Sequence, residues 1–229
     1  MKNKIPGYVF WILSITDIFA ITFNYPILQW IAKPLLLPCL VYWYIKETHG
    51  AKESNCRLMV VGLLFCWLGD VLLMFESSQS LFFIFGLVSF LIGHIFYILY
   101  FRKITSEPNK MAKQNLLILL PVIVYVFVLL NILYPSLKEL KIPVTVYAVV
   151  LGGMLSMALW QRQKIDKRIA LFFIAGATSF VISDSLLAIN KFYQPISQAG
   201  FFIMFTYCLA QYLIVMGAIK LYKSKMINS

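Results

Sequence analysis

The sequence has little charge. Of its 229 residues, 13% are charged, whereas 61% are apolar and 16% are aromatic. The mean hydropathy is +0.83. Soluble domains typically carry about 25% charged residues and 45–50% apolar ones. A soluble helical bundle would also need polar stripes, which the apolar segments lack. The composition therefore predicts an all-α, polytopic membrane protein.

The usual signatures of metal, nucleotide and nucleophile sites are also missing. The chain has only two histidines, His49 and His94, so one subunit cannot form a three-histidine zinc site. Its four cysteines do not follow the paired spacing of a disulfide framework or a zinc site. It has no HExxH sequence, no Gly-x-Ser-x-Gly elbow, no P-loop and no nucleic-acid-binding motif. We expect a protein without metal, cofactor or nucleic-acid partner.

Long apolar runs fill the chain instead. A helix that crosses the hydrocarbon core of a bilayer needs roughly 20 residues. Several charge-free runs reach this length, and others are interrupted by a single ionisable residue. We predict one transmembrane domain over residues 1–229 with eight helices, at 8–24, 27–46, 58–75, 81–101, 114–134, 142–160, 169–190 and 197–222.

The basic residues alternate with the helices. Sixteen of the 20 Lys and Arg residues lie at the two termini and in the loops after the second, fourth and sixth helices. The other loops contain only Lys138, Lys141 and Lys191. This asymmetry follows the positive-inside rule and predicts cytoplasmic termini. The cytoplasmic charge fits a bacterial inner membrane, where it can also contact anionic membrane lipids.

The two halves of the chain resemble each other. The segment Gly69-Asp70-Val-Leu-Leu aligns with Ser183-Asp184-Ser-Leu-Leu, and the helix containing His94 then aligns with the helix containing Gln211. The offset is four helices, so repeats 1–105 and 106–229 would run parallel. Any two apolar helices with a Leu-Leu step could align in this way, and the duplication is one of two interpretations.

Four charged side chains fall inside the apolar helices: Asp17, Lys33, Asp70 and Asp184. Each costs roughly 2.5–3.5 kcal/mol at a helix centre. Such residues persist when they pair, face water or act in function. We expect Lys33 to keep one carboxylate ionised, while desolvation and the neighbouring charge keep a second one protonated. Asp70 and Asp184 would then form an acid and base pair, and a structural role is expected for Asp17.

Other polar side chains could surround this pair. His94 and Tyr97 are one helical turn apart, as are Tyr207 and Gln211, so each pair can line one cavity. His94 could equally be a hydrogen-bonded histidine of the core. Asn190 closes the seventh helix, where it could act as a cap or contact a lipid head group.

Several motifs resemble the YhhN family. They are Lys33-Pro34-Leu, Gly69-Asp70-x-x-Leu-Met, Phe90-x-x-Gly93-His94-x-x-Tyr97 and Gly176-Ala-x-x-Phe180-x-x-Ser183-Asp184-Ser185-x-Leu-Ala188. The resemblance covers nearly the whole chain and includes the eight-helix layout. The family includes transmembrane lysoplasmalogenases, so the resemblance implies hydrolysis of the vinyl ether bond of a lysophospholipid, giving a fatty aldehyde and a glycerophospho-alcohol.

This reaction suits the paired aspartates. Protonation of the vinyl ether produces an oxocarbenium ion that water captures, and paired carboxyl groups serve similar chemistry in glycosidases. The hypothesis assigns catalysis to Asp70 and Asp184, with Lys33, His94, Tyr97, Ser183, Tyr207, Gln211 and Asn190 in supporting or binding roles. A proton-coupled transporter or lipid carrier could use the same charges, and a helical scaffold is a third alternative.

Overall fold

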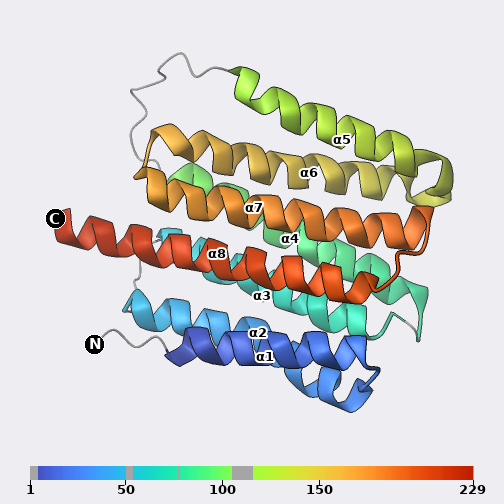
Figure 1. The fold of residues 1–229 in the computed structure, drawn as a ribbon. Helices are drawn as coiled ribbons and strands as arrows, with labels where there is room; N and C mark the ends of the chain where they lie inside the picture. Colours follow the sequence, from blue (N-terminus) through green and yellow to red (C-terminus); the bar gives the residue numbers. More distant parts are fainter. Residues whose placement is uncertain (1–4, 50–53, 77, 105–115, 229) are drawn as a thin grey trace.

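The protein is built of helices that lie side by side (Figure 1). The computed structural model describes residues 5–49, 54–76, 78–104 and 116–228, and contains no strand within them. The α-helices are α1 Ile5–Thr22, α2 Pro26–Glu47, α3 Ser54–Met74, α4 Ser80–Lys103, α5 Leu120–Leu133, α6 Lys141–Trp160, α7 Lys167–Ala188 and α8 Ala199–Asn228. Short 3₁₀ turns flank α5 and α6, and a π-helical segment, Ile189–Tyr193, extends α7.

The eight expected helices are confirmed, with shifted ends. The clearest difference is at α5, which was expected from residue 114. A 3₁₀ turn, Leu116–Leu119, precedes it, and the α-helix begins at Leu120 with a proline in its first turn. Pro121 fits this position because the first helical N–H groups have no partner within the helix. Residues 114 and 115 lie outside the described residues.

The helices make this an integral membrane protein. Six of them, α1, α3, α4, α6, α7 and α8, are long and apolar enough to cross a bilayer. The described part of α5 is a shorter apolar helix. Helix α2 has 22 residues but contains Lys33, Lys46 and Glu47, and is not among the six. That all eight helices cross the membrane stays a prediction.

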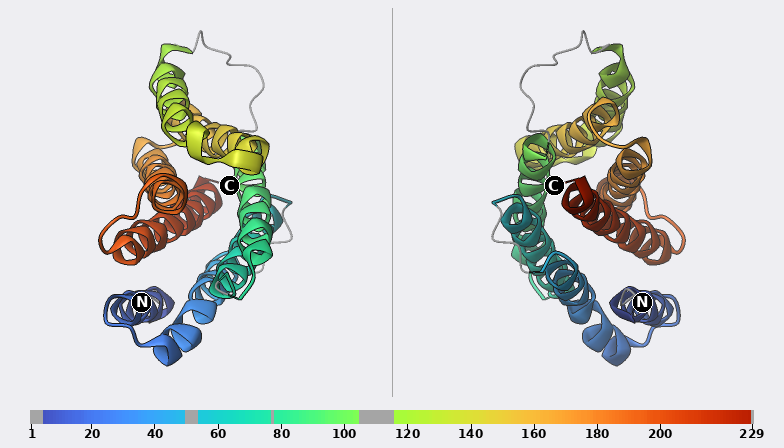
Figure 2. Two further views of the ribbon diagram at one scale, coloured as in Figure 1. Left: turned by 90° about the vertical axis from the view of Figure 1, so that its right-hand side faces the viewer. Right: turned by 90° about the vertical axis from the view of Figure 1, so that its left-hand side faces the viewer.

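Seven helices pack as a ring. Along it, α1 contacts α2, α2 contacts α3, α3 contacts α4, α4 contacts α6, α6 contacts α7, α7 contacts α8, and α8 returns to α1. Helix α5 packs on the outside, against α6 (Figure 2). Because α2 and α7 lie on different sides of this ring, side chains from both can face a common interior.

Two prolines shape α2 beside Lys33. Pro34 and Pro38 lie inside this helix, and a proline cannot donate the backbone hydrogen bond to the carbonyl four residues earlier. Pro38 thus leaves the Pro34 carbonyl free to accept from elsewhere. The indole Nε1 of Trp67 in α3 donates to this oxygen at 2.9 Å. The bond ties the interrupted part of α2 to the helix that contains Asp70.

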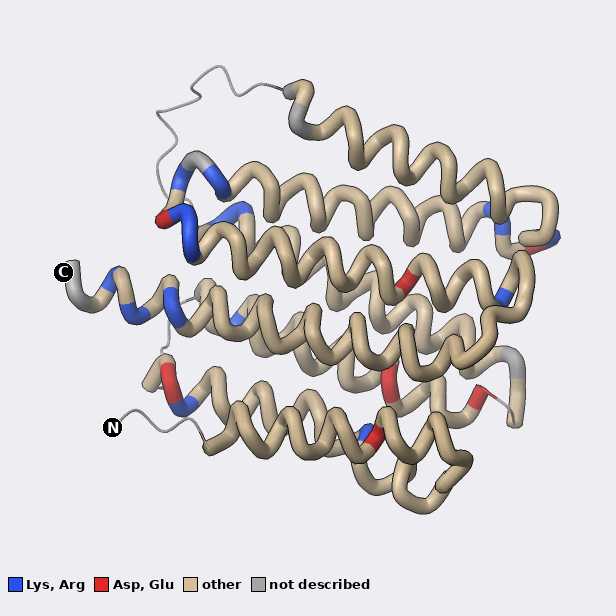
Figure 3. The backbone as a smooth tube through the Cα atoms, viewed as in Figure 1, with Lys and Arg blue, Asp and Glu red and all other residues tan. Residues whose placement is uncertain are grey.

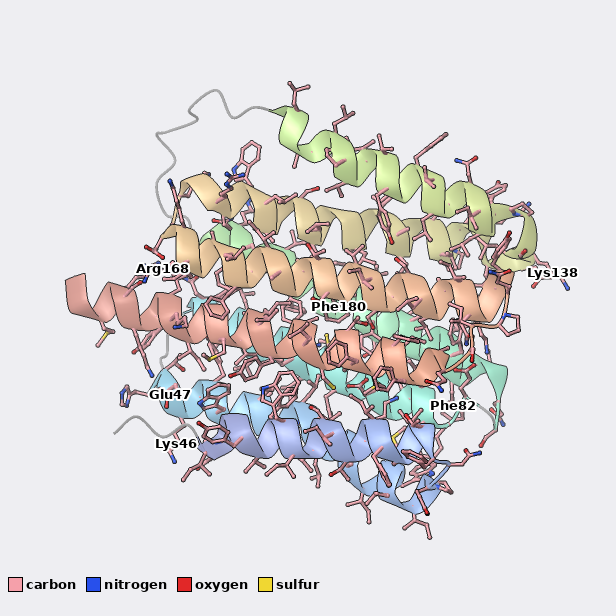
Figure 4. The ribbon with its side chains drawn as sticks, in the orientation of Figure 1. Lys46, Glu47, Phe82, Lys138, Arg168 and Phe180 are labelled. Atoms are coloured by element: carbon pink, nitrogen blue, oxygen red, sulfur yellow. The ribbon has the colours of Figure 1, made fainter. Side chains whose placement is uncertain are left out.

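The two aspartates of the candidate pair lie away from the termini. Both termini are at one end of the bundle, where Lys and Arg also gather (Figure 3). Lys46, Glu47 and Arg168 mark this end and Lys138 the opposite one (Figure 4). Asp70 and Asp184 lie close to the ends of α3 and α7, at Met74 and Ala188. Both carboxyl groups are therefore nearer the end opposite the termini.

Candidate active site

Asp70 is a buried carboxyl group that accepts a hydrogen bond from a helix across the ring. It lies in α3 and is 3% exposed. The hydroxyl of Tyr207, in α8, donates a hydrogen bond to its Oδ2 at 2.6 Å. The phenol thus fixes one oxygen of the carboxyl group.

Asp184 has the same kind of partner. It lies in α7, and the hydroxyl of Tyr147, in α6, donates to its Oδ2 at 2.5 Å. His94 Nε2 is 3.8 Å from the same oxygen, and the Asp184 side chain is 10% exposed. Each aspartate is therefore held by one tyrosine from another helix, α8 for Asp70 and α6 for Asp184.

The two aspartates face one cavity. It has a volume of about 310 Å³ and is lined by residues of α1, α2, α3, α4, α7 and α8 and of the turns that follow α1 and α3. Its polar lining residues are Asn24, Gln29, Lys33, Asp70, Glu76, Ser183, Asp184 and Tyr207. The volume is in the range of small-molecule sites. The structure thus brings Asp70 and Asp184, 114 residues apart in the sequence, onto one cavity.

Lys33 lines this cavity, and no carboxylate of the described residues is within ion-pair distance of it. Its charge acts electrostatically on Asp17 and Asp70. The lysine–carboxylate ion pairs found among the described residues are Lys191 with Glu76 and Lys223 with Glu47. Lys33 is therefore a nearby cation rather than a direct contact of either catalytic candidate.

Three other residues expected around the pair lie behind it. His94 is fully buried, with the rings of Phe180 and Tyr147 edge-on to it, and neither ring nitrogen has a hydrogen-bond partner among the described residues. The Tyr97 hydroxyl donates to Gln211 Oε1 at 2.7 Å. None of the three lines the cavity. His94 contacts Asp184 from behind, and the Tyr97–Gln211 bond joins α4 to α8.

Ser183 and Asn190 bind backbone groups. The Ser183 hydroxyl donates to the Ile203 carbonyl at 3.0 Å, which connects α7 to α8 beside the cavity. Asn190 Oδ1 accepts from the Ile196 amide at 2.9 Å. The observed role of Asn190 is to organise the turn that follows α7.

Asp17 is close to the site but separate from it. It is fully buried in α1, and neither carboxylate oxygen has a hydrogen-bond partner among the described residues. It does not line the cavity, although Ala20 and Ile21 of the same helix do. Within the described residues, no three His, Cys, Asp or Glu side chains lie close enough together to hold a metal ion.

Tyr147 is the important residue that sequence reasoning missed. A tyrosine in an apolar helix has no distinctive pattern, because many such residues lie at membrane interfaces. The internal alignment could have found it. Tyr147 precedes Asp184 by 37 residues, and Lys33 precedes Asp70 by the same number. Tyr147 therefore aligns with Lys33, the charged residue that the first half places before its aspartate.

Fold and site together define a polytopic membrane protein with two carboxyl groups on a shared cavity inside the helix bundle. The chain belongs to the YhhN family, which matches residues 28–218. This confirms the resemblance that the motifs indicated.

The chain is also similar to proteins that are named lysoplasmalogenases. The chain is 31% identical over 193 residues to lysoplasmalogenase TMEM86A of Homo sapiens, covering 80% of this chain and 76% of that protein. It is 28% identical over 192 residues to TMEM86A of Bos taurus, with the same coverage of 80% and 76%. Lysoplasmalogenase TMEM86B of Homo sapiens is 29% identical over 199 residues, covering 84% and 77%. No solved structure matches the chain.

Proposed function

We propose that this protein is a membrane-embedded lysoplasmalogenase. It would hydrolyse the vinyl ether bond of a lysophospholipid and release a fatty aldehyde and a glycerophospho-alcohol. The observation that carries the proposal is the pair Asp70 and Asp184 on one cavity of about 310 Å³ inside an apolar bundle. The relatives named lysoplasmalogenase support the same activity.

The reaction needs a proton donor and a group that stabilises a cation. A carboxylic acid protonates the vinyl ether carbon that is not bonded to oxygen, and the double bond becomes an oxocarbenium ion. Water then adds to the carbon bonded to oxygen and gives one proton to a carboxylate, which leaves a neutral hemiacetal. Breakage of its C–O bond to glycerol, with protonation of the leaving oxygen, yields the aldehyde and the alcohol. General acid catalysis of this kind contributes about 10²–10⁴-fold in rate.

Asp70 and Asp184 would perform these steps as a pair. In each, Oδ2 accepts from a tyrosine, so Oδ1 remains for the cavity that both residues line. One carboxyl group gives the proton, and the other, as a carboxylate, stabilises the oxocarbenium ion and orients the water. Lys33 supports the ionised member from a distance through its charge.

The protein would take its substrate from the outer leaflet. Both termini lie at the end of the bundle where the basic residues gather (Figure 3). If that end is cytoplasmic, as the positive-inside rule predicts, the carboxyl groups lie in the outer half of the membrane. A bacterial inner membrane fits this arrangement.

The experiment is aldehyde release in detergent by the purified protein. The substrate is 1-alkenyl lysophosphatidylethanolamine, and the matched control is the 1-acyl lysolipid with the same head group. Aldehyde from the alkenyl lipid and no fatty acid from the acyl lipid is the expected result. A folded protein that releases neither product contradicts the proposal and favours the transporter, which needs a gradient that detergent removes.

A further inference from the structure

A second, apolar hollow lies beside Asp184. Its volume is about 30 Å³, and its walls come from α3, α4, α6, α7 and the π-helical segment after α7. Phe83, Leu87, Val144 and Phe192 belong to it and not to the larger cavity. The volume has room only for the first carbons of a hydrocarbon chain. The hollow is therefore suited to the start of an apolar group.

The hollow and the larger cavity share a wall. Leu73, Phe90, Asp184 and Leu187 line both. Of these four, Asp184 alone has a polar side chain. The candidate acid or base is thus at the junction of a polar space and an apolar one.

Lys33 lies across the larger cavity from Asp184. It belongs to α2, which is separated from α7 around the ring by α3, α4 and α6 on one side and by α1 and α8 on the other (Figure 2). Asn24 and Gln29 line the cavity near the start of α2. An ammonium group beside two amide side chains can bind a phosphate.

The parts of a lysolipid follow the order of Lys33, Asp184 and the apolar hollow. Its phosphate is at one end, its hydrocarbon chain is at the other, and the glycerol with its ether oxygen joins them. In a lysoplasmalogen the vinyl ether is the bond between the polar part and the chain. It is the bond that must lie at the acid and base pair.

We propose that the lysolipid binds across Asp184, with its phosphate at Lys33 and the start of its alkenyl chain in the hollow formed by Phe83, Leu87, Val144 and Phe192. The binding mode rests on the proposed function. It assigns Lys33 to the substrate phosphate and Val144 to the chain. The vinyl ether then reaches both carboxyl groups, because Asp184 lies where the two spaces meet and Asp70 lines the larger cavity.

The proposed contact between Lys33 and the substrate phosphate is tested with two substrates that differ only in the head group. They are a 1-alkenyl glycerophosphoethanolamine and the 1-alkenyl glycerol with the same chain, which has no phosphate. In Lys33→Met, kcat/KM for the first relative to the second should fall at least about tenfold, because a charged hydrogen bond is lost with one substrate only. Lys46→Met is the matched control, since Lys46 is in the same helix but outside the cavity.

The proposed position of the alkenyl chain is tested by filling the hollow with a larger side chain. Val144 is 6% exposed, whereas Val146, two residues along α6, is 46% exposed. Val144→Phe should lower kcat/KM for a 16-carbon alkenyl lipid at least about tenfold relative to the 1-ethenyl analogue, whose alkenyl group ends at the double bond. Val146→Phe should leave this ratio unchanged. Ala188→Leu fills the hollow from α7 and should act like Val144→Phe.

The results separate the binding mode from the activity. If the wild type releases aldehyde from the alkenyl lipids and the Lys33→Met ratio equals that of the wild type, the phosphate assignment is wrong. Unchanged chain ratios in both Val144→Phe and Ala188→Leu overturn the chain assignment. If the wild type releases no aldehyde from any of these substrates, the proposed function itself fails.

Discussion

Gly62 and Gly176 make the same close approach in the two halves of the protein. A Cβ atom on Gly62 would lie 2.8 Å from the Tyr97 ring and 3.4 Å from the Gly93 carbonyl oxygen. A Cβ atom on Gly176 would lie 2.7 Å from the Ile214 side chain and 3.1 Å from the Ala210 carbonyl oxygen. The first contact joins α3 to α4 and the second joins α7 to α8.

These contacts follow the internal alignment. Gly62 and Gly176 differ by 114 positions, as do Asp70 and Asp184. Tyr97 and Ile214 differ by 117 positions, as do His94 and Gln211. Equivalent helices thus use equivalent residues, which supports the proposal of parallel repeats 1–105 and 106–229.

Alanine at either glycine should therefore destabilise the protein. In membrane helices, small residues allow the backbones to approach closely, and an added methyl group at Gly62 or Gly176 forces α3 from α4 or α7 from α8. We expect a lower midpoint of thermal unfolding in detergent for Gly62→Ala and Gly176→Ala. Gly153→Ala is the control, because the nearest atom to its Cβ would be Ile98 Cδ1 at 3.6 Å, an ordinary contact. Equal midpoints for all three variants would contradict the close approach.

The tyrosines that hold the carboxyl groups should matter for turnover. Tyr207→Phe and Tyr147→Phe each remove one hydrogen bond to an aspartate. A hydrogen bond to a charged group contributes about 1.5–3 kcal/mol, so kcat should fall about 10–100-fold if the bond supports the transition state. Aldehyde release measures this.

Tyr212→Phe is the control for these variants. Tyr212 is in α8 like Tyr207, but its ring packs against Phe10, Trp11 and Trp43, and it does not line the cavity. This variant should keep the turnover of the wild type. If Tyr212→Phe loses as much activity as Tyr207→Phe, the effect comes from packing in α8 and not from the hydrogen bond to Asp70.

The topology predicts the side of the membrane on which each end lies. A reporter that is active only in the cytoplasm should be active when it is fused after residue 229. The same reporter inserted between α7 and α8 should be inactive, because that connection lies on the opposite side. Lys191 and Glu76 form an ion pair at that second end. A carboxyl-terminal reporter found outside would reverse the orientation, and with it the leaflet from which substrate enters.

Part of the site could be predicted from sequence, for a physical reason. An aspartate inside an apolar helix is costly, so Asp70 and Asp184 stood out against their neighbours. The contact between Tyr147 and Asp184 was not predictable in the same way, because tyrosine is common in such helices. The position of His94 behind Asp184, and not on the cavity, depends on how α4 rotates against α6 and α7.

Part of the fold could likewise be predicted from sequence, and part could not. Apolar length was sufficient to find all eight helices. It did not predict the 3₁₀ turn before α5, which depends on local hydrogen bonding near Pro121, or the bond from Trp67 to the Pro34 carbonyl. The ring order, with α4 against α6 and α5 outside, comes from side-chain packing between helices distant in sequence.

The most direct test of the central claim changes each of the four aspartates to asparagine and measures aldehyde release from 1-alkenyl lysophosphatidylethanolamine. Asp70→Asn and Asp184→Asn should each lower kcat at least about 100-fold, since each removes the acid or the base. Asp17→Asn, which changes a carboxyl group outside the cavity, should keep most of the turnover. Asp166→Asn should do so too, because Asp166 caps α7 and asparagine caps helices equally well. Full turnover by either Asp70→Asn or Asp184→Asn would contradict the account.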